Sequence, residues 1–409
     1  MDSAIIPQGV KRCSFWQFAL WIGGISVFLL WAAVAAILCW LKGLNQTNLN
    51  DYFGFGAWIT ADLAIIALGA GAFFTGLMRY IFGMDELKAI VNLTVIIGFI
   101  CYSSAIAILG LDVGQPLRGW FIYWHANVHS MLTEVAFCIT CYFMVLTIEY
   151  LPLILENRQL DKFPLIHNFS HNLHHIMPVF AATGAFLSFF HQGSLGGTVG
   201  VLFGRPCGYR IHFGIWPTTF FLFILSAIAC GPCFTILITW ITENLTRKKL
   251  VKQEIIAKLA KISGWLLVVY VALKTIDTVY WAMVTAPKMG LSFMEFYQYE
   301  PFKLWILIAE VGVCGLIPAI ILLTEKGRSN YFLLIPAALL NCLGITLNRY
   351  VMTVQALALP VLPFDKFFNY IPNWAEWVTS LAPFAYGALL ISLSYRYLPV
   401  FPQEKELNP

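Results

Sequence analysis

Long apolar segments separated by short polar ones recur along the whole chain. A transmembrane helix needs about 20 consecutive, mostly apolar residues, and ten segments of the 409-residue chain fit this requirement. They cover residues 15–41, 57–78, 89–110, 129–150, 173–191, 215–241, 260–284, 304–324, 331–348 and 377–398. The longest connections hold about 20 to 30 residues, too few for a soluble domain. The pattern predicts an all-α integral membrane protein with about ten transmembrane helices.

The composition supports this prediction. Hydrophobic residues make up 59% of the chain and charged residues 11%, which excludes an ordinary soluble globular protein. The net charge of +4 is small, so it gives no indication of nucleic-acid binding. The apolar run that follows the basic N-terminus is longer than the core of a signal peptide, so we expect it to be retained as the first helix.

Positive charge is distributed unevenly between the two sides of the predicted membrane region. One set of alternate segments carries sixteen of the 25 Lys and Arg residues. This set consists of both termini and the connections after the second, fourth, sixth and eighth helices. The other set carries eight. Six of the sixteen lie in the segment TRKKLVKQEIIAKLAK. The positive-inside rule therefore predicts that both termini are cytoplasmic.

Ionisable residues gather near the predicted outer ends of four consecutive helices. Asp62 lies about four residues inside the second predicted helix, on the same face as Gly69, Phe73 and Gly76. Small residues on such a face permit close helix packing. We therefore expect Asp62 to point into the protein and away from lipid.

The fourth predicted helix begins in the segment HANVHSMLTEV, residues 125–135. Glu134 belongs to a stripe with Ser130 and Cys138 at helical spacing, whereas His129 lies on a different face. A carboxylate at this position is costly in a membrane, so it requires a partner or a function.

Two more elements contribute to the same predicted surface. His191 ends the fifth predicted helix on the same face as Ser188, and the connection after the third helix supplies Asp112 and Arg118. Four consecutive helices and their connections thus bring ionisable groups close to the same surface of the membrane.

Three uses fit this set of ionisable groups. A quinone head group needs hydrogen-bond partners at both carbonyls, and its reduction takes two electrons and two protons, which a carboxylate or histidine can relay. A haem needs two facing histidines, and the pattern offers no deep pair. In the third interpretation the groups neutralise one another, as Asp112 and Arg118 could do.

A second polar set occupies the seventh to ninth predicted helices. Lys274 and Asp277 share a face and could pair locally, Glu310 has no partner in its own helix, and Arg349 lies at the outer end of the ninth helix. These residues could form a proton or ion route, or a structural network of ion pairs.

Two further patterns are weaker. The pairs Cys138–Cys141 and Cys230–Cys233 have the spacing of redox or metal sites, but inside membrane helices such cysteines are more often packing residues. The histidines of HNFSHNLHH, residues 167–175, have no carboxylate or cysteine at fitting spacing, so we interpret them as interfacial and expect no metal site. The sequence has no P-loop, dinucleotide fingerprint or cysteine set for an iron–sulfur cluster, so a partner must bring the electrons for any redox chemistry.

Three segments together resemble the NrfD/PsrC-type membrane subunits of quinone-linked oxidoreductases: DLAIIALGAGAFFTG, LDVGQPLRGWFIYWHANVHSMLTEV and SFFHQGSLGG. This family includes the membrane subunits of polysulfide reductase, of a Hyb-type hydrogenase, of the Dsr complex and of alternative complex III. The resemblance is strongest to the quinone reductase complexes of sulfate-reducing bacteria. It covers most of the chain and implies two four-helix bundles, 51–195 and 196–350, with flanking helices in 1–50 and 351–409.

The resemblance also implies a subunit of a bacterial inner-membrane complex, with a menaquinone site in the first bundle toward the periplasm and no haem or iron–sulfur cluster in this chain. The implied partners are a ferredoxin-like iron–sulfur subunit, a multihaem cytochrome c and a molybdopterin-oxidoreductase-like subunit. Carried onto this sequence, the resemblance assigns quinone contact or proton exchange to Asp62, Asp112, His129, Glu134 and His191, with Arg118 beside them as a residue that orders the loop. It also assigns a proton route to Lys274, Asp277, Glu310 and Arg349.

Two other functions stay open at this point. The buried Lys274, Asp277 and Glu310 are also typical of an ion or solute transporter. A chain with so little outside the membrane could also be a passive membrane anchor.

Overall fold

The structure of the protein is a computed structural model that describes residues 12–155, 163–200, 212–213, 216–288, 290, 292–298, 303–358 and 368–401. Within these ranges nearly all regular structure is helical. The exception is a short antiparallel pair, β1 (His212–Phe213) with β2 (Trp216–Pro217). The predicted all-α fold class is confirmed.

The long helices carry the apolar segments of the sequence. They are α2 (Phe15–Lys42), α3 (Ala57–Leu68), α4 (Gly71–Tyr80), α5 (Lys88–Asp112), α7 (Met131–Leu155), α8 (Pro164–Gly200), α9 (Thr218–Thr246), α10 (Gln253–Tyr280), α14 (Ile317–Leu323), α16 (Tyr331–Tyr350) and α18 (Trp374–Tyr397). Short helices connect or extend them: η1 (Leu44–Gln46), η2 (Asp85–Leu87), η3 (Pro116–Arg118), α6 (Phe121–Trp124), α11 (Ala286–Lys288), α12 (Phe293–Gln298), α13 (Trp305–Leu307), α15 (Glu325–Ser329) and α17 (Ala356–Ala358). Nine helical stretches of the described residues are long and apolar enough to cross a membrane, and α8, which is bent, makes a tenth.

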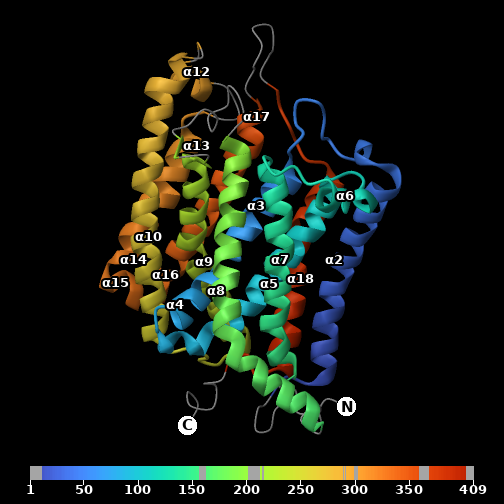
Figure 1. Ribbon diagram of the computed structural model, residues 1–409. Helices are drawn as coiled ribbons and strands as arrows, with labels where there is room; N and C mark the ends of the chain where they lie inside the picture. The colour runs from blue at the N-terminus through green and yellow to red at the C-terminus, as the bar shows by residue number, and fades with distance from the viewer. Residues whose placement is uncertain are drawn as a thin grey trace.

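The helices run side by side as one upright bundle (Figure 1). In its middle, α9 contacts α3, α4 and α8 as well as α10 and α16. At its edge, α2 packs on α18, and the start of α2 and the end of α18 lie at the same end of the bundle (Figure 1). We call this end the terminal end and the other the distal end. The division into two four-helix bundles stays a prediction, because α9 joins the two groups closely.

The second predicted helix is broken. Residues 57–78 were expected as one helix, but the structure has α3 and α4 with a break at Gly69 and Ala70. The backbones of α4 and α9 cross closely just after it, since a Cβ on Gly231 would lie 2.3 Å from the Gly71 backbone nitrogen. Glycine is needed on both sides of this crossing, and Gly69 similarly lies against Cys101 of α5. The predicted close packing is therefore present.

The fifth predicted helix is longer than expected. It was predicted over 173–191, but α8 extends to Gly200. The added turns are polar, and their hydroxyls are satisfied inside the helix, since Ser194 donates to the Phe190 carbonyl at 2.7 Å and Thr198 to the Ser194 carbonyl at 2.9 Å. The hydropathy pattern underestimated the length of this helix because the added turns are polar, although their hydroxyls bond within the helix. His191, expected at the outer boundary, is therefore inside the helix.

Three wide helical turns lie on neighbouring helices of the second half. The π-helical segments are η5 (Trp281–Thr285), η6 (Ile308–Leu316) and η7 (Val351–Gln355). Segment η5 extends α10, η6 joins α13 to α14, and η7 extends α16. Such turns shift the register of a helix and re-aim its side chains, and Glu310 lies within η6.

Candidate functional site

Asp62 lies in the second turn of α3 with only 1% of its surface exposed. Neither of its carboxylate oxygens has a hydrogen-bond partner among the described residues. Asp112, at the end of α5, acts electrostatically on it. The expectation that Asp62 points into the protein is confirmed. A buried carboxyl group with no partner is costly, so it is a candidate for a ligand or proton site.

His191 is fully buried in α8. Its ring centroid lies 5.7 Å from that of Tyr102 on α5, and the backbone of Val135 on α7 faces it. Neither ring nitrogen makes a hydrogen bond of regular geometry within the described part of the chain. Tyr102 also interacts electrostatically with Asp62, so this tyrosine is a neighbour of both buried ionisable groups.

Hydrogen bonds fix the helices around this pair. The Tyr102 hydroxyl and the Ser188 hydroxyl are 2.7 Å apart, which ties α5 to α8. The Gln192 side-chain amide donates to the Ile66 carbonyl at 2.9 Å, which ties α8 to α3. Sequence reasoning missed Gln192, because the helix was expected to end one residue earlier. We call Asp62, Tyr102, Ser188, His191 and Gln192 the buried cluster.

A cleft of about 850 Å³ opens beside the buried cluster, between the distal ends of α5 and α7 and the loop that contains η3 and α6. Most of its lining is apolar, and Gln115, Arg118, Tyr123 and Thr140 supply polar groups. Val135, whose backbone faces His191, also lines this cleft. This combination of an apolar wall and a few polar groups is typical of a small-molecule site.

The other predicted residues of the first set lie nearer the surface. Glu134 is half-buried in the first turn of α7, and Asp112 is half-buried at the end of α5. His129 and Arg118 are exposed. Arg118 and Asp112 form no ion pair among the described residues. The six residues are thus split into a buried pair, Asp62 and His191, and an outer group of four, of which Arg118 lines the cleft.

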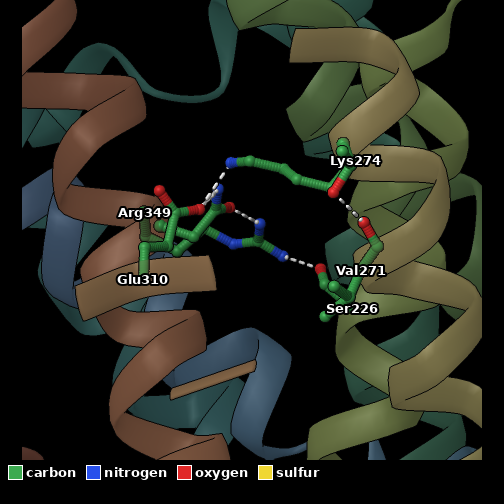
Figure 2. A network of polar contacts seen from close by, with 7 residues as sticks. Ser226, Val271, Lys274, Glu310 and Arg349 are labelled. Carbon is green, nitrogen blue, oxygen red and sulfur yellow. Dashed lines mark hydrogen bonds and ion pairs between the residues drawn. The ribbon is translucent and has the colours of Figure 1, made fainter. Parts of the chain in front are cut away.

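Three residues of the second predicted set, Lys274, Glu310 and Arg349, belong to one continuous network (Figure 2). Lys274 pairs with Glu310 at 2.5 Å, and Asn348 donates to the same Glu310 oxygen at 2.7 Å. Arg349 donates to the Asn348 side-chain oxygen at 2.7 Å and to the Ser226 hydroxyl at 2.8 Å. The network joins α10, η6, α16 and α9, and we call it the buried ion network.

Two expectations about this set are corrected. Lys274 pairs with Glu310 of a different helix and not with Asp277, which accepts a hydrogen bond from Thr218 at 2.7 Å. Arg349 is not at the end of its helix, because η7 and α17 continue α16. The hydroxyls of Thr60 and Thr353 are 2.7 Å apart. Since Thr60 is two residues before Asp62 and Thr353 is four after Arg349, the ion network and the buried cluster lie at similar depth.

Sequence reasoning also missed two acidic residues. Glu376 is fully buried at the start of α18, where it accepts hydrogen bonds from the backbones of Asn48 and Asn373 and from the Tyr370 hydroxyl. Glu149, on α7, lines a polar cavity of about 420 Å³ near the terminal end with Arg79 and Lys88. Glu376 follows Asn373 at the spacing of a capping box, a signal that was available in the sequence.

The remaining sequence motifs form no metal cluster within the described residues. The cysteines of both Cys-x-x-Cys pairs are free thiols. In the histidine tract, the rings of His171 and His175 lie 5.0 Å apart on an exposed face of α8. The side chains of His167 and His174 lie outside the described residues.

The chain matches one protein family and several individual proteins. Residues 45–360 match the family described as Polysulphide reductase, NrfD. The chain is 58% identical over 409 residues to "Menaquinone reductase, integral membrane subunit" of Nitratidesulfovibrio vulgaris, covering 100% of this chain and 98% of that protein. It is 26% identical to the "Probable Ni/Fe-hydrogenase 2 b-type cytochrome subunit" of Escherichia coli over 371 residues, 88% of this chain and 87% of the relative. It is 22% identical to a selenate reductase subunit of Mesobacillus selenatarsenatis over 407 residues, 90% of this chain and 91% of the relative.

Proposed function

Because the chain belongs to the NrfD family of membrane proteins, we propose that it is the membrane subunit of a respiratory menaquinone reductase complex. An iron–sulfur partner subunit, of the ferredoxin-like kind, supplies the electrons, and a multihaem cytochrome c and a molybdopterin-oxidoreductase-like subunit complete the complex. The name of the 58% identical relative supports menaquinone as the substrate and reduction as the direction.

One observation carries the proposal that menaquinone binds at the distal end. The buried cluster contains a carboxylate and an imidazole whose polar atoms have no regular hydrogen-bond partner among the described residues. A quinone presents two carbonyl oxygens and, on reduction, takes up two protons. Asp62 in its protonated form and His191 through a ring N–H match these needs, because each then donates a hydrogen bond and can release a proton.

The other residues of the first set have supporting roles in this proposal. The cleft admits the substrate, and Arg118 orders its rim. The hydrogen bond between Tyr102 and Ser188 fixes the packing of α5 on α8 beside His191. Asp112, Glu134 and His129 exchange protons with water nearer the surface, since they are half-buried or exposed. With the termini in the cytoplasm, the site faces the periplasm.

The proposal is tested on the purified complex that contains this chain. Bound menaquinone is extracted and quantified, and turnover is measured with a soluble menaquinone analogue. We expect Asp62→Asn and His191→Asn to lower turnover by about 100-fold or more, as for loss of a general acid, while the complex still assembles. The matched controls, Asp51→Asn and His125→Asn, change exposed residues of the same kinds and should leave turnover unchanged.

Two results would contradict the proposal. If the complex holds no menaquinone and is insensitive to quinone-site inhibitors, the chain is a passive anchor. If the chain alone, in liposomes, transports a labelled ion and the Asp62 and His191 variants keep full turnover, the transporter function replaces the redox one.

A further inference from the structure

The connection between α5 and α7 exposes several large apolar side chains. Leu117 and Trp124 are 91% and 78% exposed, and Trp120 is 51% exposed. Within residues 115–128, which we call the aromatic loop, the only fully charged side chain is that of Arg118. Contiguous apolar patches are uncommon on a surface that faces water, so this one indicates a contact with another surface.

The aromatic loop has two faces. Trp120 and Trp124, four residues apart at the two ends of the turn formed by α6, lie on one side of this short helix. Ile122 and Tyr123 instead line the cleft beside the buried cluster. The hydroxyls of Tyr123 and Thr140 are 2.6 Å apart, which fastens the loop to α7. The loop is therefore the outer wall of the cleft, with its inner face on the protein and its outer face exposed.

The outer face of the loop continues a surface that faces lipid. The loop joins two helical stretches that are long and apolar enough to cross a membrane, Asp85–Asp112 and Met131–Leu155. On the second stretch Phe137 and Met144 are exposed on one helix face, and the Phe137 ring contacts the Tyr123 ring with 5.1 Å between the centroids. In Figure 1, α6 lies at the side of the bundle, next to α7 and toward α2. The exposed side chains of the loop thus extend the lipid-facing strip of α7 to its distal end.

The cleft reaches the same side of the bundle. Its lining includes Gly43 and Leu44, which follow α2, and Leu132, which is exposed on α7. Among the described helices α2 packs mainly on α18, and α7 packs mainly on α8, so close packing of α2 on α7 does not seal the cleft. A ligand can therefore reach the cleft from the bilayer without passing through water.

From these features we infer that the aromatic loop is immersed in the interfacial layer of the distal leaflet, and that the cleft takes its ligand from the lipid phase. Tryptophan is enriched at this depth, because its ring is apolar and its N–H can reach water or head groups. A soluble partner subunit would cover the distal ends of the helices, whereas this patch lies at their side (Figure 1). The second half of the inference rests on the proposed function and specifies it further: the substrate is a quinone with a long apolar tail that enters sideways from the membrane.

The position of the loop is tested by photo-crosslinking in the purified complex, reconstituted in liposomes of phosphatidylethanolamine and phosphatidylglycerol. The photoreactive residue p-benzoyl-phenylalanine is placed at position 124, and the adducts formed on irradiation are identified by mass spectrometry. We expect phospholipid adducts at Trp124, as at the lipid-facing control Met144, and none at Asp51, an exposed residue of the loop before α3. An adduct with another subunit, or no adduct at Trp124 while Met144 is labelled, would overturn the inference whether or not the complex reduces a quinone.

The entry route is tested by comparing menaquinone in the liposome membrane with a soluble, short-tailed analogue. The double variant Leu117→Glu with Trp124→Glu changes two residues that do not line the cleft. We expect its turnover of membrane-bound menaquinone to fall by about 10-fold or more, since loss of one buried apolar side chain of this size changes an equilibrium by about that factor. Turnover of the soluble analogue should stay unchanged.

The matched control is Leu117→Met with Trp124→Phe, which keeps both side chains apolar and should resemble the wild type with either substrate. If the double glutamate variant does not assemble, Leu117→Glu alone takes its place. Equal loss with the two substrates, or no loss with either, would overturn the entry route. If the wild type turns over neither substrate, the proposed function is wrong, and the crosslinking result alone then decides the position of the loop.

Discussion

The carboxylate of Glu310 provides the sharpest test of whether the buried ion network is structural. Its Oε1 accepts hydrogen bonds from Lys274 and Asn348 at 2.5 and 2.7 Å, and both Glu310 and Lys274 are buried. In Glu310→Gln the amide oxygen can still accept these bonds, but the Lys274 ammonium loses its counter-charge. Loss of one partner of a buried pair costs about 3–5 kcal/mol, so we expect the free energy of unfolding to fall by this amount.

The double variant Lys274→Met with Glu310→Gln should recover most of that loss. It removes the uncompensated charge and leaves an apolar side chain of similar length in its place. The free energy of unfolding is measured for the full chain by denaturant titration, with helical circular dichroism as the signal. The four proteins of the cycle then give the coupling energy between the two side chains.

The ion pair between Lys258 and Glu86 is the control. Its two charged atoms are 2.6 Å apart, but its side chains are 37% and 61% exposed. Exposed pairs contribute at most about 1 kcal/mol, so Glu86→Gln should have little effect. The reasoning is refuted if Glu310→Gln is as mild as Glu86→Gln, or if the double variant loses the sum of the two single losses. Unchanged stability combined with slower proton uptake in liposomes would instead favour the proton route.

Two further predictions concern packing and helix capping. Gly231→Ala places a Cβ against the Gly71 backbone and should lower the free energy of unfolding by about 1–3 kcal/mol. In the control Gly24→Ala, a Cβ would meet nothing within 4 Å, so the free energy of unfolding should stay unchanged or rise by up to about 1 kcal/mol. Equal effects of the two substitutions would contradict the close crossing of α4 and α9. Asn373→Ala removes the side-chain oxygen that caps α18 through the backbones of Ala375 and Glu376 and should cost about 1 kcal/mol in thermal or denaturant unfolding. Asn373→Ser, whose hydroxyl can still cap the helix, should recover part of this loss.

The sequence predicted the number and type of the membrane helices well, for a physical reason. A membrane helix must be apolar over a fixed length, and this constraint is local. All ten predicted segments coincide with helices of the structure. The helix ends were less predictable, as α8 illustrates, because Ser194 and Thr198 satisfy their hydroxyls within the helix and so tolerate burial.

The candidate site was predicted in part. The burial of Asp62 followed from its position among small residues, and it is confirmed. The pairing of Lys274 with Glu310 was not predictable, because it depends on how two helices distant in sequence are rotated toward each other. The wide turn η6, which contains Glu310, adds to that rotation. The separation of the buried Asp62 and His191 from the outer Glu134 and His129 likewise depends on tertiary packing.

The pairing of α2 with α18 has a consequence for biosynthesis. In the described structure α2 packs mainly on α18 and touches α5 only slightly. Only 17% of the residues in its apolar 18-residue stretch are buried. Trp21 of α2 donates to the Ser392 hydroxyl of α18 at 3.0 Å. Because α2 precedes α18 in the chain, it waits in the lipid until α18 has been synthesised. A chain stopped before residue 374 would leave α2 without its main docking surface and would also uncover the faces of α5 and α3 that α18 contacts, so quality-control proteases could distinguish unfinished from finished molecules.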